Sequence, residues 1–152
     1  MADSVGMELD SYIKNYFGIG DVDIRTYSPL TLAYIGDAVY EIIIRTIVVG
    51  KGNRQTSKLH QATTTLVKAH SQAVLADIIS PILDEEETDV LRRGRNAKSA
   101  TTAKNATVAD YRMATALEAL VGYLYLTNQM DRLLELIKFG LEKEEFSWLK
   151  EI

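Results

Sequence analysis

The sequence predicts an all-α protein built as one domain, and three observations lead to this expectation. A chain of 152 residues has the usual size of a single domain. An apolar content of 47% can fill a core and is too high for a disordered chain. Only two prolines occur, and no regular series of turn signals separates short apolar runs, as it would between β-strands. We therefore expect one helical domain over residues 1–152, with its core between residues 28 and 141.

The composition also indicates a compartment. The chain contains no cysteine, which fits a reducing environment. Its first ten residues lack the basic and apolar regions of a signal peptide. The longest weakly charged stretch, residues 113–130, is interrupted by Glu118, Gly122 and Thr127, so we expect a buried helix there rather than a membrane span. These features predict a cytoplasmic protein with no membrane contact.

Local signals define the helices in chain order. A short helix is expected around residues 7–16, and a long one from Ser28, an N-cap followed by proline, to two glycines near residues 50–52. Further helices are expected over Ser57–Ile79, 84–93, Asp110–Thr127 and Asp131–Ile152. The acids at 84–87 and the arginines before Gly94 suit the two ends of a helix dipole, so they do not indicate a metal site.

Two acids stand out in the long apolar helix that begins at Ser28. Asp37 and Glu41 are the only charges between Thr26 and Ile44, and their spacing of four places them on one face. A buried carboxylate without a partner is costly, so a cation or metal is expected nearby. The alternative is an exposed stripe in which Glu41 pairs with Arg45 on the surface.

A basic segment contrasts with the net charge of −4. Residues 90–109 contain five arginines and lysines and no acid, and residues 94–107 are small and polar, which suits phosphate and sugar contacts. A face of the Ser57–Ile79 helix could also meet a phosphate backbone. The alternatives are a flexible linker and a solvated helix face. The candidate RNA-binding residues are Lys68, Gln72, Arg93, Arg95, Asn96, Lys98, Ser99 and Lys104.

Glu118 is a second isolated acid in an apolar helix. It is the only charge after Arg112 in residues 110–127, and its alternative role is a buried structural ion pair. Two core helices with one isolated acid each, and a basic polar loop between them, are typical parts of a metal-dependent phosphodiesterase. The spacing alone does not specify that chemistry.

Three sequence motifs carry a family resemblance. LAYIGDAVYE resembles the signature helix of the ribonuclease III family, and TALEALVGYLYL resembles the family's second catalytic helix. RGRNAKSATTAKN resembles the loop of Mini-III, its short bacterial branch. The motifs occur in the family's order and span roughly residues 28–130. The resemblance implies an all-α ribonuclease III endonuclease-domain helical fold.

The resemblance also assigns roles to residues. Asp37 and Glu118 match two catalytic acids that bind Mg²⁺, for which Mn²⁺ is expected to substitute. The broader family has two more acids, at positions where this chain has Ala33 and Thr115, so the number of metal ions is open. Glu41 matches none of these four acids, and we keep it as a candidate that contacts the metal ligands rather than the metal.

The activity implied is hydrolysis of double-stranded RNA by a homodimer, each protomer cutting one strand and leaving 5′-phosphate and 3′-hydroxyl ends. The substrate implied is the precursor of large-subunit ribosomal RNA. The sequence ends without the double-stranded-RNA-binding domain of larger members, so the basic loop and the Lys68–Gln72 face are expected to hold RNA by its A-form shape.

Two other functions compete with this one. The first is a non-catalytic dimeric RNA-binding module of the same fold, against which the presence of both Asp37 and Glu118 argues. The second is an all-α nucleotide pyrophosphohydrolase, which clusters acids by ExxE spacing. The one pair with that spacing in the acidic run, Asp84 and Glu87, is better explained as a helix start.

Overall fold

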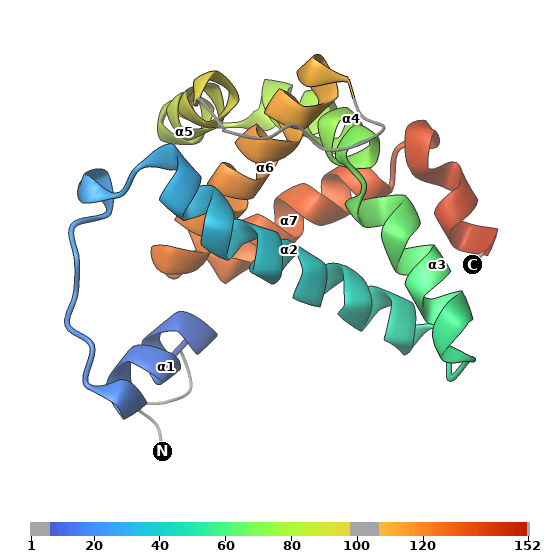
Figure 1. Cartoon of the computed structure of the whole chain (residues 1–152), viewed down its shortest axis with the longest axis horizontal. Coiled ribbons are helices and arrows are strands. Elements are labelled where there is room, and N and C mark those ends of the chain that lie inside the picture. The colour runs from blue at the N-terminus through green and yellow to red at the C-terminus, as the bar shows by residue number, and fades with distance from the viewer. Residues whose placement is uncertain (1–6, 98–106, 152) are drawn as a thin grey trace.

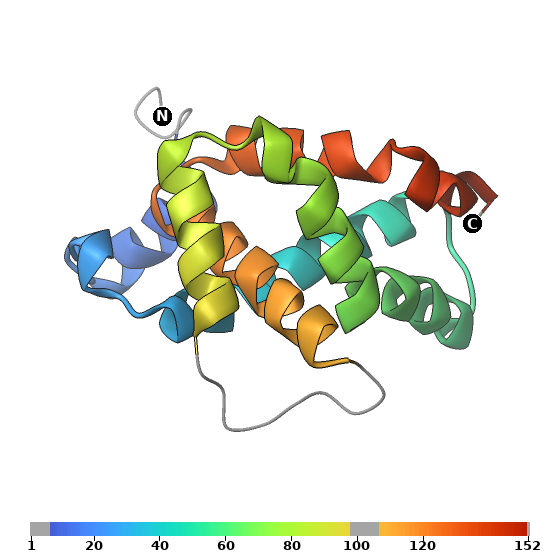
Figure 2. The same ribbon diagram turned by 90° about the horizontal axis from the view of Figure 1, so that it is seen from above.

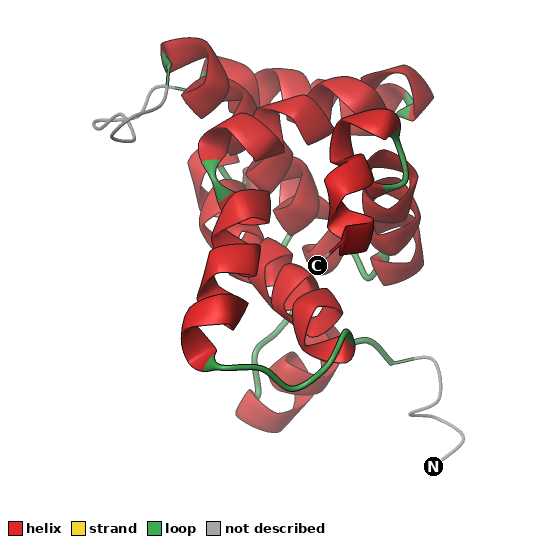
Figure 3. Ribbon diagram, turned by 90° about the vertical axis from the view of Figure 1, so that its right-hand side faces the viewer, coloured by secondary structure: helices red, strands yellow, loops and turns green. Residues whose placement is uncertain are grey.

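A computed structural model of the chain describes residues 7–97 and 107–151. Within these ranges every regular element is a helix, as Figure 3 shows, and the predicted all-α fold is confirmed. The elements in chain order are α1 (Leu9–Phe17), η2 (Ile24–Thr26), α2 (Pro29–Gly50), α3 (Thr56–Val67), α4 (Ala69–Ile79), η3 (Ser80–Ile82), α5 (Glu85–Asn96), α6 (Val108–Leu126), α7 (Met130–Leu141) and η4 (Glu144–Glu151).

Helix α6 lies at the centre of the fold. It packs against α2, α4, α5 and α7, and Figures 1 and 2 show it crossing behind α2 and running between α4 and α5. A helix enclosed on all sides must be apolar around its whole circumference. From Ala114 to Tyr125, most side chains of α6 are accordingly buried: Ala114, Thr115, Ala116, Leu117, Ala119, Leu120, Val121, Leu124 and Tyr125. In the described part of the chain, no helix has the length and apolar character needed to cross a membrane.

Two glycines set the distance between α2 and α6. A Cβ atom on Gly36 would overlap the backbone carbonyl of Glu118, and one on Gly122 would overlap the carbonyl oxygen of Leu32. The two backbones are therefore in direct contact at their crossing. Helix α2 itself begins as predicted, because the Ser28 hydroxyl accepts a hydrogen bond from the Thr31 N–H at 3.2 Å.

Helix α5 begins with the predicted cap but ends later than expected. Asp84 and Glu87 form a reciprocal capping box, with bonds of 2.8 and 2.9 Å between each carboxylate and the other residue's N–H. Glu87 is also buried, and Arg132 of α7 donates two hydrogen bonds of 2.9 Å to it. The expected helix end before Gly94 is wrong. Gly94 lies inside α5, where a Cβ atom would come within 2.9 Å of Ala116 on α6.

The predicted helix Ser57–Ile79 is two helices, because the backbone is extended at Lys68 (φ −64°, ψ 154°). A helix end leaves carbonyl groups without partners in its last turn. Here three buried side chains donate hydrogen bonds to these carbonyl groups. The Tyr40 hydroxyl donates to the Leu66 carbonyl at 3.1 Å. The Ser71 hydroxyl donates to Thr65, and the Gln72 amide donates to Val67 at 2.9 Å.

The two ends of the chain pack differently from one another. The expected last helix is divided into α7 and η4, and Phe146 joins the core with 3% of its surface exposed, rather than packing loosely. Helix α1 is set off from the helical body in Figure 1. It is attached through Glu8, which accepts a hydrogen bond from the Met130 N–H at 2.9 Å, and Ser11, which donates to Asn128.

Because the backbones of α2 and α6 are in contact, any side chain at position 36 should strongly destabilise the fold. Gly36→Ala should lower the free energy of unfolding by more than about 3 kcal/mol, beyond the usual cost of overpacking, because the new atom meets backbone. Gly50→Ala is the matched control on the same helix. Nothing lies within 4 Å of a Cβ atom there, so the change should stay below about 1 kcal/mol. Urea unfolding measures both, and equal losses would refute the close contact.

Candidate active site

Asp37 and Glu118 meet where α2 crosses α6. Asp37 is exposed and follows directly after Gly36, and Glu118 is half-buried at the backbone carbonyl that Gly36 contacts. The two carboxyl groups are close enough for the charge of Asp37 to act on Glu118. Both line a pocket of about 440 Å³. The other residues around this pocket are Leu30, Ala33, Tyr34, Ile35, Ala38, Tyr111 and Thr115.

The surroundings of Glu118 disfavour its charge. Burial, followed by the nearby carboxyl group and negative charge of Asp37, raises the pKa of Glu118 from 4.5 to about 8, and the nearby amide of Gln72 opposes this shift. Burial and the charge of Glu118 also raise the pKa of the neighbouring Tyr40. Without a cation, the Glu118 carboxyl group therefore keeps its proton at neutral pH. A cation between them would reverse that preference.

The donor set fits a hard divalent cation. Carboxylate oxygens are the ligands that Mg²⁺ prefers, and Mg²⁺ retains several water molecules, so few protein ligands are needed. Ala33 and Thr115 line the pocket without adding a carboxylate, and the Thr115 hydroxyl is bonded to the Tyr111 carbonyl of its own helix at 3.1 Å. No group of three or more His, Cys, Asp or Glu residues placed to hold a metal occurs in residues 7–97 and 107–151. A metal here would thus rest on two carboxylates.

Glu41 has the surface role that the sequence offered as an alternative. Its carboxylate pairs with Arg45 at 2.8 Å, and the two side chains are 40% and 50% exposed. Glu41 is therefore neutralised within α2.

The candidate RNA-binding residues are spread over several surroundings. Lys68 is exposed at the α3–α4 break, and Arg95 and Asn96 are exposed on the last turn of α5, where Arg93 is half-buried. Lys98, Ser99 and Lys104 lie outside the described residues. Gln72 is only 3% exposed, which argues against an RNA contact through its side chain.

The structure adds contacts that the sequence did not indicate. His70 Nδ1 lies 3.0 Å from the Asp110 carboxylate, joining the first turns of α4 and α6 near the pocket. Tyr40 and Gln72 both come close to Glu118. The helix break at Lys68 brings the start of α4 close to Glu118. A lysine within a stretch of helical apolar periodicity does not predict such a break.

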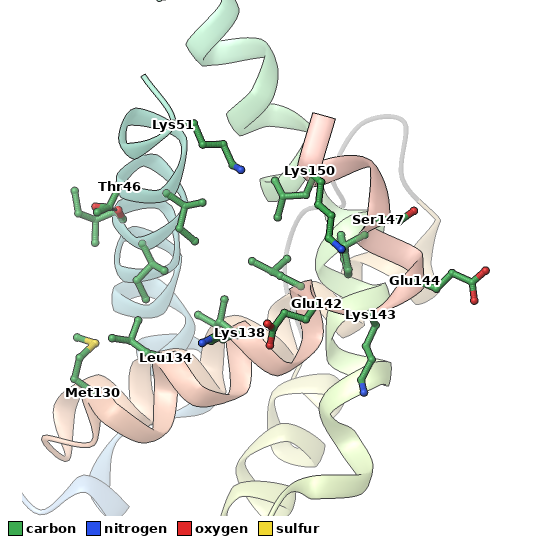
Figure 4. Close-up of a pocket in the computed structure, with 17 residues that line it drawn as sticks. Thr46, Lys51, Met130, Leu134, Lys138, Glu142, Lys143, Glu144, Ser147 and Lys150 are labelled. Carbon is green, nitrogen blue, oxygen red and sulfur yellow. Dashed lines mark hydrogen bonds between the residues drawn. The ribbon is translucent and has the colours of Figure 1, made fainter. Parts of the chain in front are cut away.

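A larger, apolar groove lies away from both candidate catalytic acids. It lies between α2, α7 and η4, has a volume of about 770 Å³, and is drawn in Figure 4. Apolar side chains, chiefly isoleucines and leucines, form most of its wall, and Lys51, Lys138, Lys143 and Lys150 lie around it. Neither Asp37 nor Glu118 lines it, so the candidate active site is the smaller pocket at the α2–α6 crossing.

Comparisons with known proteins agree on one family. The sequence profile of the ribonuclease III domain matches residues 30–129. The chain is 50% identical over 127 residues to Mini-ribonuclease 3 of Clostridium tetani, covering 82% of this chain and 83% of that protein. It is 48% identical over 123 residues to Mini-ribonuclease 3 of Enterococcus faecalis, covering 80% and 93%. A crystal structure of a Fusobacterium nucleatum protein superposes with a TM-score of 0.74 at 32% identity, covering 81% of this chain and all of that one.

The raised pKa of Glu118 predicts how stability depends on pH. Without metal, the folded state holds the Glu118 proton up to pH about 8, whereas the unfolded chain releases it near pH 4.5. Stability should therefore fall as pH rises between these values, by roughly 2–4 kcal/mol from this residue. Glu118→Gln should remove that fall, and Glu41→Gln should retain it. Urea unfolding at pH 5 and pH 8 in EDTA tests this, and identical slopes for wild type and Glu118→Gln would contradict it.

Proposed function

This chain belongs to the ribonuclease III family, and we propose that it is a Mg²⁺-dependent endoribonuclease that cuts double-stranded RNA, with precursor large-subunit ribosomal RNA as substrate. The observation that carries the proposal is the meeting of Asp37 and Glu118 in one pocket, on the two helices whose sequences resemble the family's catalytic helices. The ribosomal substrate rests on the similarity to Mini-ribonuclease 3 proteins.

The roles of the two acids follow from their surroundings. When bound, Mg²⁺ lowers the pKa of a water molecule and neutralises charge on the phosphate. Asp37, which is exposed, and Glu118, which is half-buried on α6, would hold the metal through their carboxylate oxygens. Hydrolysis breaks the bond between phosphorus and the 3′ oxygen, so the products carry a 5′-phosphate and a 3′-hydroxyl.

RNA would be held by cations beside this pocket. The protein as a whole carries a net charge of −4, so the attraction must be local. Lys68 and Arg95 are exposed, and Lys98 and Lys104 follow Arg95 in the sequence. These groups suit phosphate contacts, and A-form RNA is recognised chiefly by shape and 2′-hydroxyl groups.

A homodimer completes the proposal, because cutting both strands needs two sites. Helix α2 carries several exposed apolar side chains, from 40% to 83% exposed: Leu30 and Tyr34 at the active-site pocket, Ile42 at the apolar groove, and Val49 near the end of the helix. Helix α1 adds the exposed Leu9, Ile13, Tyr16 and Phe17. Apolar patches of this kind mark protein interfaces. If a second copy packs against α2 across a two-fold axis, the two active-site pockets would face opposite strands of the RNA duplex.

The catalytic assignment is tested by replacing Asp37. Asp37→Asn should lower the rate of duplex RNA cleavage in Mg²⁺ by about a thousandfold or more, because a metal contributes several kcal/mol to such a step. Folding and duplex binding should persist. Asp77→Asn, an exposed acid on α4, is the control and should cut normally. Normal cutting by Asp37→Asn would overturn the assignment and favour the non-catalytic module.

The basic surface is tested by salt dependence. Arg95→Ala with Lys98→Ala should weaken duplex binding and reduce the slope of log K against log salt by about two, roughly 0.9 for each lost phosphate contact. Lys138→Ala with Lys150→Ala removes two charges from the distant apolar groove and should leave the slope unchanged. If both double variants behave alike, the loop after α5 is not the RNA contact.

The dimer is tested by placing a charge on α2. The wild type should have twice the monomer mass by light scattering at tens of micromolar, and Ile42→Asp should yield monomers because an interface core excludes unpaired charge. Val108→Asp is matched, since both side chains are 57% exposed, and should leave the mass unchanged. A monomeric, active wild type would exclude this interface.

A further inference from the structure

We propose that helix α1 of each protomer docks into the apolar groove between α2, α7 and η4 of a second copy of this chain. The inference rests on the homodimer in the proposed function, and it names the surfaces that would hold the two copies together. Helix α1 and the two groove walls formed by α7 and η4 lie outside residues 30–129, which the family profile matches. Most of the proposed contact therefore lies in segments that flank the family domain.

Helix α1 is amphipathic, and its apolar side faces outward. Leu9, Ile13 and Phe17 follow one another at intervals of four, and Tyr16 lies beside them on the same side of the helix. Their exposed fractions are 56%, 42%, 76% and 85% in that order. A surface helix normally turns its apolar side toward the core. The orientation of α1 is the reverse, so its apolar side is open to another molecule.

Polar contacts on the opposite side hold α1 in this orientation. Asp10 is only 5% exposed and pairs with Lys14 at 3.1 Å. The Ser11 hydroxyl donates a hydrogen bond of 2.9 Å to the Asn128 side chain at the end of α6. Rotating the helix until its apolar side met its own chain would break the Ser11 bond and bring Asp10 out of its buried position. The apolar side of α1 is therefore placed to meet a second copy.

The groove offers an apolar surface of suitable size. Its volume of about 770 Å³ has room for several large side chains, and Ile42 and Leu134 on its wall are 57% and 43% exposed. Tyr16 and Phe17 each occur twice in a two-fold dimer, and a buried aromatic side chain covers roughly 150–250 Å². The four aromatic side chains would thus bury roughly 600–1,000 Å² of the roughly 1,200–2,000 Å² found in stable interfaces.

The charges of the two surfaces are complementary. Residues 8–25, which contain α1, carry four acids, one lysine and one arginine. The groove is lined by four lysines and two glutamates. Lys51 follows α2, Lys138 lies on α7 and Lys150 lies on η4, so every wall contributes a positive charge, as Figure 4 shows. A net negative segment and a net positive groove attract one another and favour this pairing over contact between like surfaces.

The helix and the groove lie side by side in each copy, so two copies can exchange helices. Glu8, directly before α1, accepts a hydrogen bond from the Met130 N–H at 2.9 Å, and Met130 lines the groove. A two-fold axis between α1 and the groove would lay each helix on the groove of the other copy. Ile42, which lines the groove, is also one of the exposed α2 residues assigned to the dimer, so the contact continues that interface.

The test uses one variant for each surface. Tyr16→Ser with Phe17→Ser removes the two exposed aromatic side chains from α1, and Leu134→Asp places a charge in the groove. Each variant alone should dimerise at least about tenfold more weakly than wild type in analytical ultracentrifugation, because aromatic anchors commonly contribute that much to an interface. Val108→Ser, at an exposed position on α6, is the control and should dimerise normally.

Mixing the two variants should restore dimerisation in part. The mixed dimer keeps one intact contact between a helix and a groove, whereas neither homodimer keeps any. The mixed dimer should therefore form in preference to both homodimers when one variant is tagged and captured. A lack of preference would overturn the proposal, as would wild-type dimerisation by the Tyr16→Ser, Phe17→Ser variant. A wild type that is monomeric would instead refute the homodimer itself, which separates the two failures.

Photocross-linking covers the case in which Leu134→Asp does not fold. Phe17 is replaced by benzoylphenylalanine in a mixture of ordinary and isotope-labelled protein, so mass spectrometry distinguishes links within a copy from links between copies. The product between copies should join position 17 to the groove segment, residues 130–150. Links confined to one copy, or links between copies that fall outside the groove, would overturn the proposal. The same substitution at Val108 should give no link to the groove.

Discussion

The direct contact between the backbones of α2 and α6 is the constraint on which the rest of the structure depends. Gly36 and Gly122 each face a carbonyl group of the other helix, so the two helices cross at the smallest separation that backbones allow. Asp37 is the neighbour of one contact, and Glu118 provides its carbonyl. Any side chain at the crossing would separate the two acids. The close approach of α2 and α6 is therefore needed both for core packing and for bringing the two acids together.

A buried acid, Glu87, and a half-buried acid, Glu118, are neutralised in opposite ways. Glu87 lies beside Arg132, whose guanidinium holds the pKa of that carboxyl below its usual range, so Glu87 is a structural ion. No arginine or lysine pairs with Glu118 among the described residues, and burial together with the charge of Asp37 moves its pKa upward instead. Because no positive charge lies beside Glu118 among the described residues, a cation is expected to bind there. The amide of Gln72 opposes only part of the upward pKa shift.

The sequence was sufficient for elements that follow local rules and insufficient for those set by packing. Asp37 and Glu118 could be found because isolated charges in long apolar helices are unusual, and the Asp84–Glu87 cap follows from its motif. Gly94 was misread as a helix end because glycine commonly follows one, whereas here it allows α5 to approach α6. The break at Lys68 depends on donors from Tyr40, Ser71 and Gln72, two of which lie beyond it and one in another helix. No local pattern encodes such a break.

Asp37 and Glu118 sit in the middle of long helices, while Lys68, Arg95 and Asn96 sit at helix ends. Helix ends and loops tolerate substitution and insertion far better than core crossings do. Under the proposed assignment of these residues, substitutions that accumulate in the helix ends and loops would change which RNA is bound long before they change cleavage. In evolutionary terms, substrate choice can then change while the cleavage chemistry stays the same. The chemistry depends on the α2–α6 crossing, which the two glycines make possible.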